Sequence, residues 1–368
     1  MNRVLHEQMI RGIVHDLKLS EPILFVDNEK KGRSGHAGHA LATFDEGKII
    51  DFHANTSGIR LGGHSGFGWM EYQISEDFGE SFGPSQKFPY SWDTFLDGYW
   101  AVAIEKVVSP KKNVLVAFCT LLSQMREPCY EPYGIPNVLR SEDGGKTWSP
   151  AFRLCERRGR VFDALYIQGS IFVLEFCNDS EESFFGNKPE HQYRIYKSDD
   201  DGRTFYEHCV VPFPDTTGRS YGNMIVTPES KLIVYTYNVN DQNNMDYAIS
   251  SDGGKTWDST GLSFVAKQIR NPQVGLLDGQ FILHGRAGES ETGHGAFVLY
   301  TSKDGIVWDE GTILIDDKSA CFYSNNLTVT GADGKERMLV QYSENVKDPG
   351  TPWSGQVNVM HFWLESMK

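Results

Sequence analysis

A short motif of the form Ser-x-Asp-x-Gly-x-Thr-Trp recurs along this chain of 368 residues and constrains its fold more than any other feature. Four clear copies begin at Ser75, Ser141, Ser198 and Ser250. A fifth copy, Thr301–Trp308, is degraded, because Lys303 stands where the aspartate belongs. In such a motif the Asp and Ser/Thr side chains hydrogen-bond nearby backbone groups, and the glycine takes up a conformation that other residues disfavour. Each copy therefore predicts a stapled hairpin turn, and one or two carboxylates per copy are too few for a metal cage.

The copies divide the chain into similar units, since they begin roughly 50 to 65 residues apart, a spacing typical of β-propeller blades. In the first unit, apolar runs at Ala40–Phe44, Ile49–His53 and Trp69–Ile74 predict three strands ahead of the motif. One further unit fits after Trp308 but ends without a motif, so it lacks an outermost strand. We therefore predict an all-β, six-bladed β-propeller.

The N-terminal part of the chain supplies the missing strand. Pro22–Val26 is a strand-like run that belongs to no unit, and we expect it to complete the last blade and to close the ring. The prediction is a single propeller domain over residues 21–368, preceded by an extension over residues 1–20.

Charge and composition exclude some classes of partner. With 35 Lys and Arg against 49 Asp and Glu, the net charge is −14, and no basic stretch suggests a nucleic-acid ligand. No apolar run is long enough to span a membrane, and the first residues lack the apolar core of a signal peptide. The six cysteines have no metal-ligand spacing. We expect a cytoplasmic protein, or a secreted one if a signal peptide was removed, and the oligomeric state stays open.

The mouth of the central channel is the expected ligand site, because the first strand of every unit begins there. Candidate residues on these first strands are His36, His39, Asp97, Trp100, Arg160, Asp163, Arg219, Tyr221, Arg270 and Tyr323. The ends of the second strands add His53, Arg286 and Glu344. Several arginines beside carboxylates indicate a polar, perhaps anionic, ligand. The alternative is that these side chains hydrogen-bond one another between blades.

Histidines gather in the first unit, where His36, His39, His53 and His64 lie close together in the sequence. Their spacing matches no metal-ligand pattern, so we predict no metal and no cofactor. A general acid/base, a sugar-binding or a structural role is open to each histidine. The Gly-rich connection Asn55–Gly68, with Arg60 and His64, is expected to be a loop over the mouth.

Asp-box motifs on a six-bladed propeller resemble the sialidase (neuraminidase) superfamily over nearly the whole chain. The resemblance implies three arginines that grip a substrate carboxylate, a tyrosine nucleophile paired with glutamate, and an aspartate acid/base on an early loop. Tyr323-Ser324 resembles the segment around that nucleophile. Asn223 stands where the glutamate is expected, Ala37-Gly38-His39 stands in place of an Arg-Ile-Pro-like triplet, and Asn55–Gly68 holds no carboxylate.

These observations favour an exo-acting carbohydrate-active enzyme, most simply a glycoside hydrolase on a short, possibly acidic glycan. Tyr323 would be the nucleophile or proton donor, and His39 or His64 the acid/base. Arg219, Arg270 and Arg286 would form the anion clamp. Two alternatives remain: a lyase on uronate-containing oligosaccharides that uses His, Tyr and Arg, and a glycan-binding propeller without catalysis.

Overall fold

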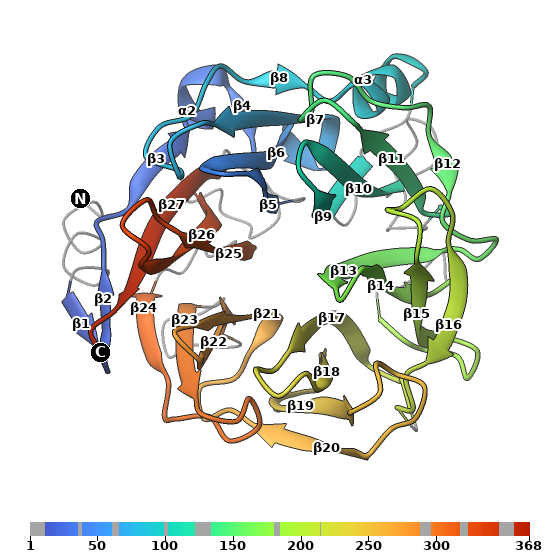
Figure 1. Ribbon diagram of the computed structural model, residues 1–368, viewed down its shortest axis with the longest axis vertical. Helices are drawn as coiled ribbons and strands as arrows, with labels where there is room; N and C mark the ends of the chain where they lie inside the picture. The colour runs from blue at the N-terminus through green and yellow to red at the C-terminus, as the bar shows by residue number, and fades with distance from the viewer. Residues whose placement is uncertain are drawn as a thin grey trace.

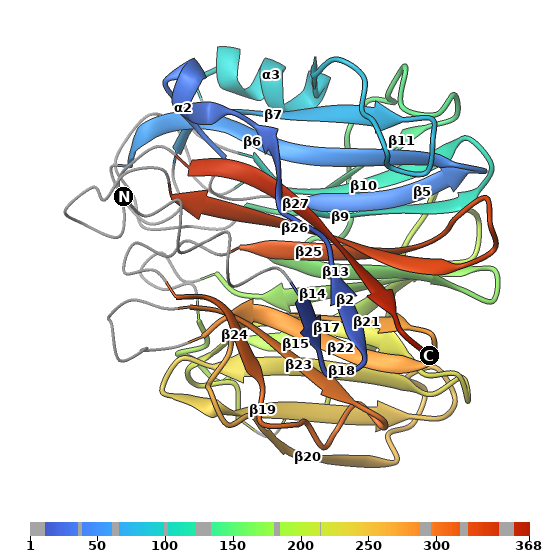
Figure 2. The same ribbon diagram turned by 90° about the vertical axis from the view of Figure 1, so that its left-hand side faces the viewer.

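The computed structural model describes residues 12–35, 39–60, 66–98, 102–121, 134–179, 185–213, 215–287, 296–316, 323–345 and 357–368. Six antiparallel sheets are arranged in a ring about a central axis, as Figure 1 shows, and in Figure 2 the strands run roughly along that axis from one face of the ring to the other. The predicted six-bladed, all-β propeller is therefore confirmed. Each blade has one strand at the ring axis and three further strands that lead outward, and the first and last blades carry one and two additional strands.

The strands can be grouped by their place in the blade. The channel-side strands are β5 (Ala40–Asp45), β9 (Val102–Lys111), β13 (Gly159–Ile167), β17 (Arg219–Val226), β21 (Arg270–Leu277) and β25 (Ser324–Thr330). The second strands are β6 (Lys48–Arg60), β10 (Val114–Leu121), β14 (Ser170–Cys177), β18 (Leu232–Asn238), β22 (Gln280–Arg286) and β26 (Glu336–Asn345). Strands such as β10 read as continuous apolar runs, because neighbouring blades cover both of their faces.

The outer half of each blade is more exposed. The third strands are β7 (Gly66–Ser75), β11 (Asn137–Ser141), β15 (Gln192–Ser198), β19 (Asp241–Ser250), β23 (Ala296–Ser302) and β27 (Val357–Ser366). The fourth strands are β8 (Gln86–Lys87), β12 (Phe152–Arg153), β16 (Tyr206–Val210), β20 (Ser259–Phe264), β24 (Thr312–Asp316) and, in the last blade, β3 (Ile23–Val26).

The ring closes through the N-terminal segment, as predicted. Strand β3 pairs antiparallel with β27, so the first part of the chain completes the blade made by the last part. A hairpin of β1 (Gly12–Val14) and β2 (Leu17–Leu19) extends the same sheet, because β2 pairs with the far half of β27. Leu17 and Leu19 are buried in the core between the last two blades. The chain ends are thus held by β-pairing and by apolar burial.

The Asp-box turns have the geometry that their sequences predict. In the four clear copies the serine hydroxyl accepts a hydrogen bond from the glycine N–H four residues on, at 2.7–2.8 Å. The aspartate accepts bonds from both the backbone and the hydroxyl of the Thr or Ser at the seventh position. These bonds from Thr256 lower the pKa of Asp252 to about 2. The carboxylates are structural staples.

The fifth box corrects the sequence interpretation. Ser302 and Asp304, and not Thr301 and Lys303, occupy the Ser and Asp positions, with Ser302 Oγ 3.0 Å from Gly305 N. Asp304 accepts bonds from Ser302 Oγ and from the N–H of Val307. In this box no residue separates the aspartate from the glycine, whereas one residue separates them in the other four copies. A search with the spacing of those four copies therefore assigns the Ser and Asp positions one residue too early.

This register predicts which residue stabilises the fifth turn. Asp304→Ala removes several hydrogen bonds and should lower the free energy of unfolding by about 1–2 kcal/mol. Lys303→Ala should change it by less than about 0.5 kcal/mol, because it removes none of the bonds of the turn. Chemical denaturation of the two variants compares them, and equal effects would show that the assigned register is wrong.

Three further elements bear on the predictions. A helix, α3 (Pro89–Leu96), leads into the second blade and was not predicted. A short helix, α2 (Asn28–Lys31), and strand β4 (Arg33–Ser34) follow β3, and β4 pairs with β6. The expected loop Asn55–Gly68 is in large part strand, because β6 continues to Arg60 and pairs there with β7. Strand β4 pairs with the part of β6 that extends beyond the end of β5, so this part of β6 also has a partner strand. The local sequence of β6 does not reveal this pairing.

Candidate functional site

A group of arginine and tyrosine side chains gathers at the mouth end of four successive blades. We call it the mouth cluster, and its members are Arg160, Tyr221, Tyr237, Arg270, Arg286 and Tyr323. All six side chains are at least partly buried, and the three tyrosines belong to one apolar core. The members lie at the mouth ends of β13, β17, β18, β21 and β22 and just ahead of β25.

Bulges in the channel-side strands shape this end of the channel. The pairing register shifts between Val161 and Asp163, between Arg219 and Gly222, and between Arg270 and Gln273. Asn271, inside the last of these shifts, has a positive φ of 52°. Bulges interrupt regular pairing and change the direction of nearby side chains, and they are common beside binding sites.

Arg270 and Arg286 form the most unusual pair in the cluster. They are direct partners across β21 and β22, so two positive charges face each other on one hairpin. Like charges in this arrangement destabilise a sheet. Arg286 is only 7% exposed. Among the described residues, no carboxylate forms an ion pair with either arginine, and the buried Arg270 Nε has no hydrogen-bond acceptor. Within the part of the chain that the structure describes, the positive charge of the pair therefore has no acidic partner.

Tyrosine side chains surround this pair. Arg286 Cζ lies 5.8 Å from the ring centre of Tyr323. The rings of Tyr221 and Tyr323 are 6.0 Å apart, and those of Tyr221 and Tyr237 are 6.4 Å apart. Burial lowers the pKa of Arg270, but the nearby hydroxyl groups of Tyr237, Tyr323 and Tyr221 raise it to a net value above the ordinary one. Arg270 therefore interacts electrostatically with all three tyrosines.

The position of Tyr323 is fixed by its neighbours in the chain. Its N–H donates to Ser343 Oγ at 3.0 Å, and its carbonyl accepts from the N–H of Ser343 at 2.8 Å. The next residue, Ser324, is 2.9 Å from Nδ1 of the buried His284. Burial lowers the pKa of His284 to about 3, so this imidazole is neutral at pH 7. Tyr323 is thus held on a rigid strand end.

Arg160 connects the cluster to the second blade. Its Nη1 donates to Tyr221 Oη at 2.7 Å, and its Nη2 forms a short ion pair with Glu105 of β9. Arg160 is fully buried, whereas the Glu105 side chain is 16% exposed. Glu105 is the one described carboxylate with a direct contact to a mouth-cluster arginine. Glu105 was not among the residues predicted from the sequence. A Glu-Lys pair inside an otherwise apolar channel-side strand is unusual, and this pair could have indicated it.

Asp163 lies in the wall of the channel and joins blades. Its carboxylate accepts from Asn223 Nδ2 and from the N–H of Met224, each at 2.6 Å. Lys106 Nζ lies 3.3 Å from the same carboxylate and 2.8 Å from Asn325 Oδ1. Burial raises the pKa of Asp163, and Lys106 and the N–H donors oppose the shift. These bonds match the alternative in which polar residues connect blades.

The other predicted residues are not members of the cluster, although Glu344 lies next to it. Glu344 follows Ser343, which hydrogen-bonds the backbone of Tyr323. Arg219 forms a two-bond ion pair with Asp246, at 2.5 and 2.8 Å. His53 lies between blades, with its Nε2 3.6 Å from Glu71, and Asp97 is exposed at the end of α3. Glu344 follows Tyr342 on the same face of β26, and burial together with the Glu344 charge raises the pKa of Tyr342.

The remaining predicted residues belong to the first unit and to the segment after α3. His39 is buried beside β5, where its carbonyl accepts from Asn325. His36, His64, Trp100 and the side chain of Arg60 lie outside the described part of the chain. The cluster therefore brings together Arg160, Tyr221, Arg270, Arg286 and Tyr323 from the predicted set and adds Tyr237.

Glu175, at the end of β14, faces two thiols. Its carboxylate lies 3.5 Å from Cys155 Sγ and 3.3 Å from Cys177 Sγ. Burial raises its pKa to about 7, against which the hydrogen bonds from the thiols act. Because side chains alternate between the two faces of β14, the Glu175 side chain points toward the second blade, where Cys155 lies.

This buried acid gives a pH-dependent stability. The folded state holds a proton on Glu175 up to about pH 7, whereas the unfolded chain loses it near pH 4.5. Stability should therefore fall as pH rises from 4.5 to 7, by about 3 kcal/mol in all. Glu175→Gln, which mimics the protonated form, should exceed the wild type in thermal stability at pH 8 and match it at pH 5. A variant less stable than the wild type at pH 8 would contradict this.

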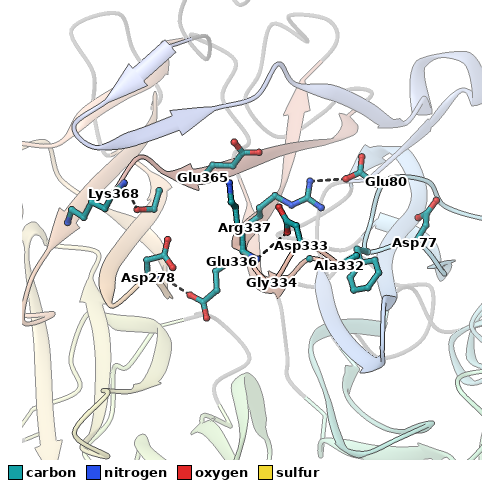
Figure 3. A pocket seen from close by; sticks show the side chains of 14 residues that line it. Asp77, Glu80, Asp278, Ala332, Asp333, Gly334, Glu336, Arg337, Glu365 and Lys368 are labelled. Carbon is teal, nitrogen blue, oxygen red and sulfur yellow. Dashed lines mark hydrogen bonds and ion pairs between the residues drawn. The ribbon is translucent and has the colours of Figure 1, made fainter.

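A second concave region lies on the face opposite the mouth. This cavity of about 680 Å³ is lined by the first Asp-box, the turn between β25 and β26 and the C-terminal residues (Figure 3). Two of its acidic side chains already have partners: Glu80 pairs with Arg337, and Glu336 accepts from the N–H of Asp278. Within the described ranges, no three His, Cys, Asp or Glu side chains converge to hold a metal, and no helix could span a membrane. The mouth cluster remains the stronger candidate site.

No protein-family model and no curated protein sequence matches the chain. A structure of a protein of unknown function from Dyadobacter fermentans is similar with a TM-score of 0.74 and 16% identity, over 96% of this chain and 100% of that one.

Solved sialidases are also similar in fold. Trypanosoma rangeli sialidase in complex with the inhibitor DANA matches with a TM-score of 0.61 and 14% identity, over 90% of this chain but 55% of that one. The NanB sialidase from Streptococcus pneumoniae matches with a TM-score of 0.60 and 12% identity, over 93% and 70% of the two chains. At such identities the likeness concerns the fold. The chain therefore has the sialidase-like six-bladed β-propeller fold.

Proposed function

We propose that the protein is a glycoside hydrolase that acts on a carboxylate-bearing sugar at the channel mouth. The single observation that carries this proposal is the cross-strand pair of Arg270 and Arg286, which has no acidic partner among the described residues. A carboxylate is the natural ligand of such a pair, because guanidinium groups bind it through two parallel hydrogen bonds. The likeness in fold to sialidases, one of them in complex with 2,3-difluorosialic acid, supports a sugar ligand.

The charges of the cluster support an acidic substrate together with a tyrosine nucleophile. Arg160, Arg270 and Arg286 bring three positive charges, of which Glu105 neutralises one. A substrate carboxylate and a phenolate at Tyr323 would balance the other two. Guanidinium groups beside a phenol stabilise the oxyanion that a nucleophile needs, which gives Tyr323 a source of activation other than a glutamate.

A panel of aryl glycosides tests the proposal. Sialic acid and uronic acids supply the acidic members, and galactose and glucose the neutral ones. We expect release of the aryl group from at least one acidic glycoside and from no neutral one. An unsaturated product absorbing in the near ultraviolet would instead indicate a uronate lyase. Binding by calorimetry without turnover would indicate a glycan-binding propeller, and either result would overturn the hydrolase proposal.

A further inference from the structure

Lys106 and Asn325 are in contact on the strands nearest the ring axis, although they belong to the second and the last blade. Lys106 Nζ lies 2.8 Å from Asn325 Oδ1 and 3.3 Å from Asp163 Oδ1. Asn325 is 2% exposed, Asp163 is fully buried, and the Lys106 side chain is 12% exposed. A primary amine, a carboxamide and a carboxylate therefore meet at one point that is largely shielded from water.

A bulge in β9 brings Lys106 to this point. The pairing register of β9 with β10 shifts at Glu105, which is an extra residue in β9. A bulge disrupts the regular ladder and can direct a side chain toward a site. Glu105 forms its ion pair with Arg160 of the third blade, and the next residue, Lys106, reaches Asn325 of the last blade.

The carboxamide of Asn325 is held in one orientation. Its Nδ2 donates to the carbonyls of His39 and Glu105, at 2.7 and 2.9 Å. Its Oδ1 accepts from the N–H of Asn326 at 2.9 Å. A backbone N–H on a carbonyl oxygen stabilises the negative charge that develops there when a nucleophile attacks the carbon. The two carbonyls can hold the nitrogen that would leave.

Asp163 lies where it can take a proton from the amine. Its Oδ1 faces Lys106 Nζ, while its Oδ2 accepts from Asn223 Nδ2 and from the N–H of Met224. Burial raises the pKa of Asp163, so this carboxylate is a stronger base than an exposed aspartate. A lysine amine becomes a nucleophile when a neighbouring base removes its proton.

We propose that Lys106 and Asn325 join in the folded protein through an isopeptide bond, with Asp163 as the proton carrier. The deprotonated amine of Lys106 bonds to Cγ of Asn325, and the carbonyl electron pair moves to Oδ1. The pair then restores the carbonyl while the bond from Cγ to Nδ2 breaks. Of the two protons that the Lys106 ammonium loses, Asp163 passes one to the leaving nitrogen, and the other converts the released ammonia to ammonium. The reaction involves no oxidation or reduction.

The bond would tie the second blade to the last blade and so brace the ring across its first blade. The two residues are 219 positions apart in the chain, and a covalent link that closes so long a loop strongly restricts the unfolded chain. Lys106 follows Glu105, the partner of Arg160. Asn325 lies two residues after Tyr323. The link would therefore also hold strand ends that position the mouth cluster.

Mass spectrometry of the full-length protein tests the proposal. We expect the wild type to be lighter than its sequence by one ammonia, and a protease digest to contain a branched peptide that joins the segments around Lys106 and Asn325. Lys106→Arg keeps the positive charge but cannot form this bond, so its mass should equal that of its sequence. Lys111→Arg, at the exposed end of the same strand, should lose ammonia as the wild type does.

Asp163→Asn tests the proton carrier. It should slow formation of the branched peptide by roughly 10²-fold or more, and an unchanged rate would show that Asp163 has no such role. A wild-type mass equal to that of the sequence after prolonged incubation of the folded protein would overturn the proposal. Loss of ammonia on an unbranched peptide would overturn it as well. None of these measurements uses a glycoside, so their outcome is independent of the proposed hydrolase function.

Discussion

Tyr323→Phe is expected to lower the turnover of an acidic glycoside by roughly 10³-fold or more, which corresponds to about 4 kcal/mol of transition-state stabilisation. The substitution removes the nucleophilic oxygen and keeps the ring, so its packing against Tyr221 is preserved. Steady-state kinetics on the aryl glycoside cleaved by the wild type measures the effect. The binding constant should change far less than the turnover number, because the arginine pair is untouched.

A matched control separates chemistry from packing. Tyr247→Phe removes a hydroxyl from β19, in the outer part of the fourth blade, and should leave turnover unchanged. If Tyr323→Phe keeps wild-type turnover, Tyr323 has no covalent role and the proposed mechanism is wrong. If both variants lose activity in parallel with thermal stability, the effect of Tyr323→Phe comes from folding.

Arg286→Gln should weaken binding of the acidic sugar and at the same time stabilise the free protein. Loss of a charge-assisted carboxylate contact costs about 1.5–3 kcal/mol, or roughly 10- to 100-fold in affinity. Removal of a like charge opposite Arg270 should raise the free energy of unfolding by up to about 1 kcal/mol. A lower affinity together with a higher free energy of unfolding is expected when two like charges face each other until a ligand of opposite charge binds.

Titration calorimetry and denaturation measure these two effects. Arg286→Lys keeps the charge but loses the planar fork, so its affinity should lie between those of the wild type and Arg286→Gln. A Gln variant that is both less stable and equally able to bind the acidic sugar would show that Arg286 is a structural residue. Equal weakening toward neutral sugars would show that it does not recognise a carboxylate.

The architecture could be predicted from sequence because its signals are local. Each Asp-box is complete within eight residues, and the copies mark where each blade turns. Pro22–Val26 could be assigned to the last blade because only that blade lacked a fourth strand. The fifth box lost its register because one residue is absent before Gly305. Helix α3 and the long strand β6 depend on packing and pairing that the fixed spacing does not encode.

The candidate site could be predicted only in part, because side-chain partners depend on contacts between blades. The sequence placed Arg219 and Arg270 at equivalent strand starts, but Asp246 pairs with Arg219 and no described carboxylate pairs with Arg270. Glu105 lies inside an apolar run, so its contact with Arg160 becomes visible only when β9 and β13 are side by side. The repeat shows which residues occupy equivalent positions in the blades. Which of their side chains meet at the mouth depends on the tertiary structure.

The central claim is that Tyr323 attacks an acidic sugar held by Arg270 and Arg286. A complex described as a covalent intermediate with 2,3-difluorosialic acid is known for Trypanosoma rangeli sialidase, to which this fold is similar. The most direct measurement is peptide mapping by mass spectrometry after incubation with this compound, or with the matching fluorinated uronic acid if a uronide is the substrate. The adduct should lie on the peptide that contains Tyr323, and at a fixed concentration of the compound it should form far more slowly in Arg286→Gln. An adduct on a different residue, or its absence while the wild type turns over the parent glycoside, would contradict the claim.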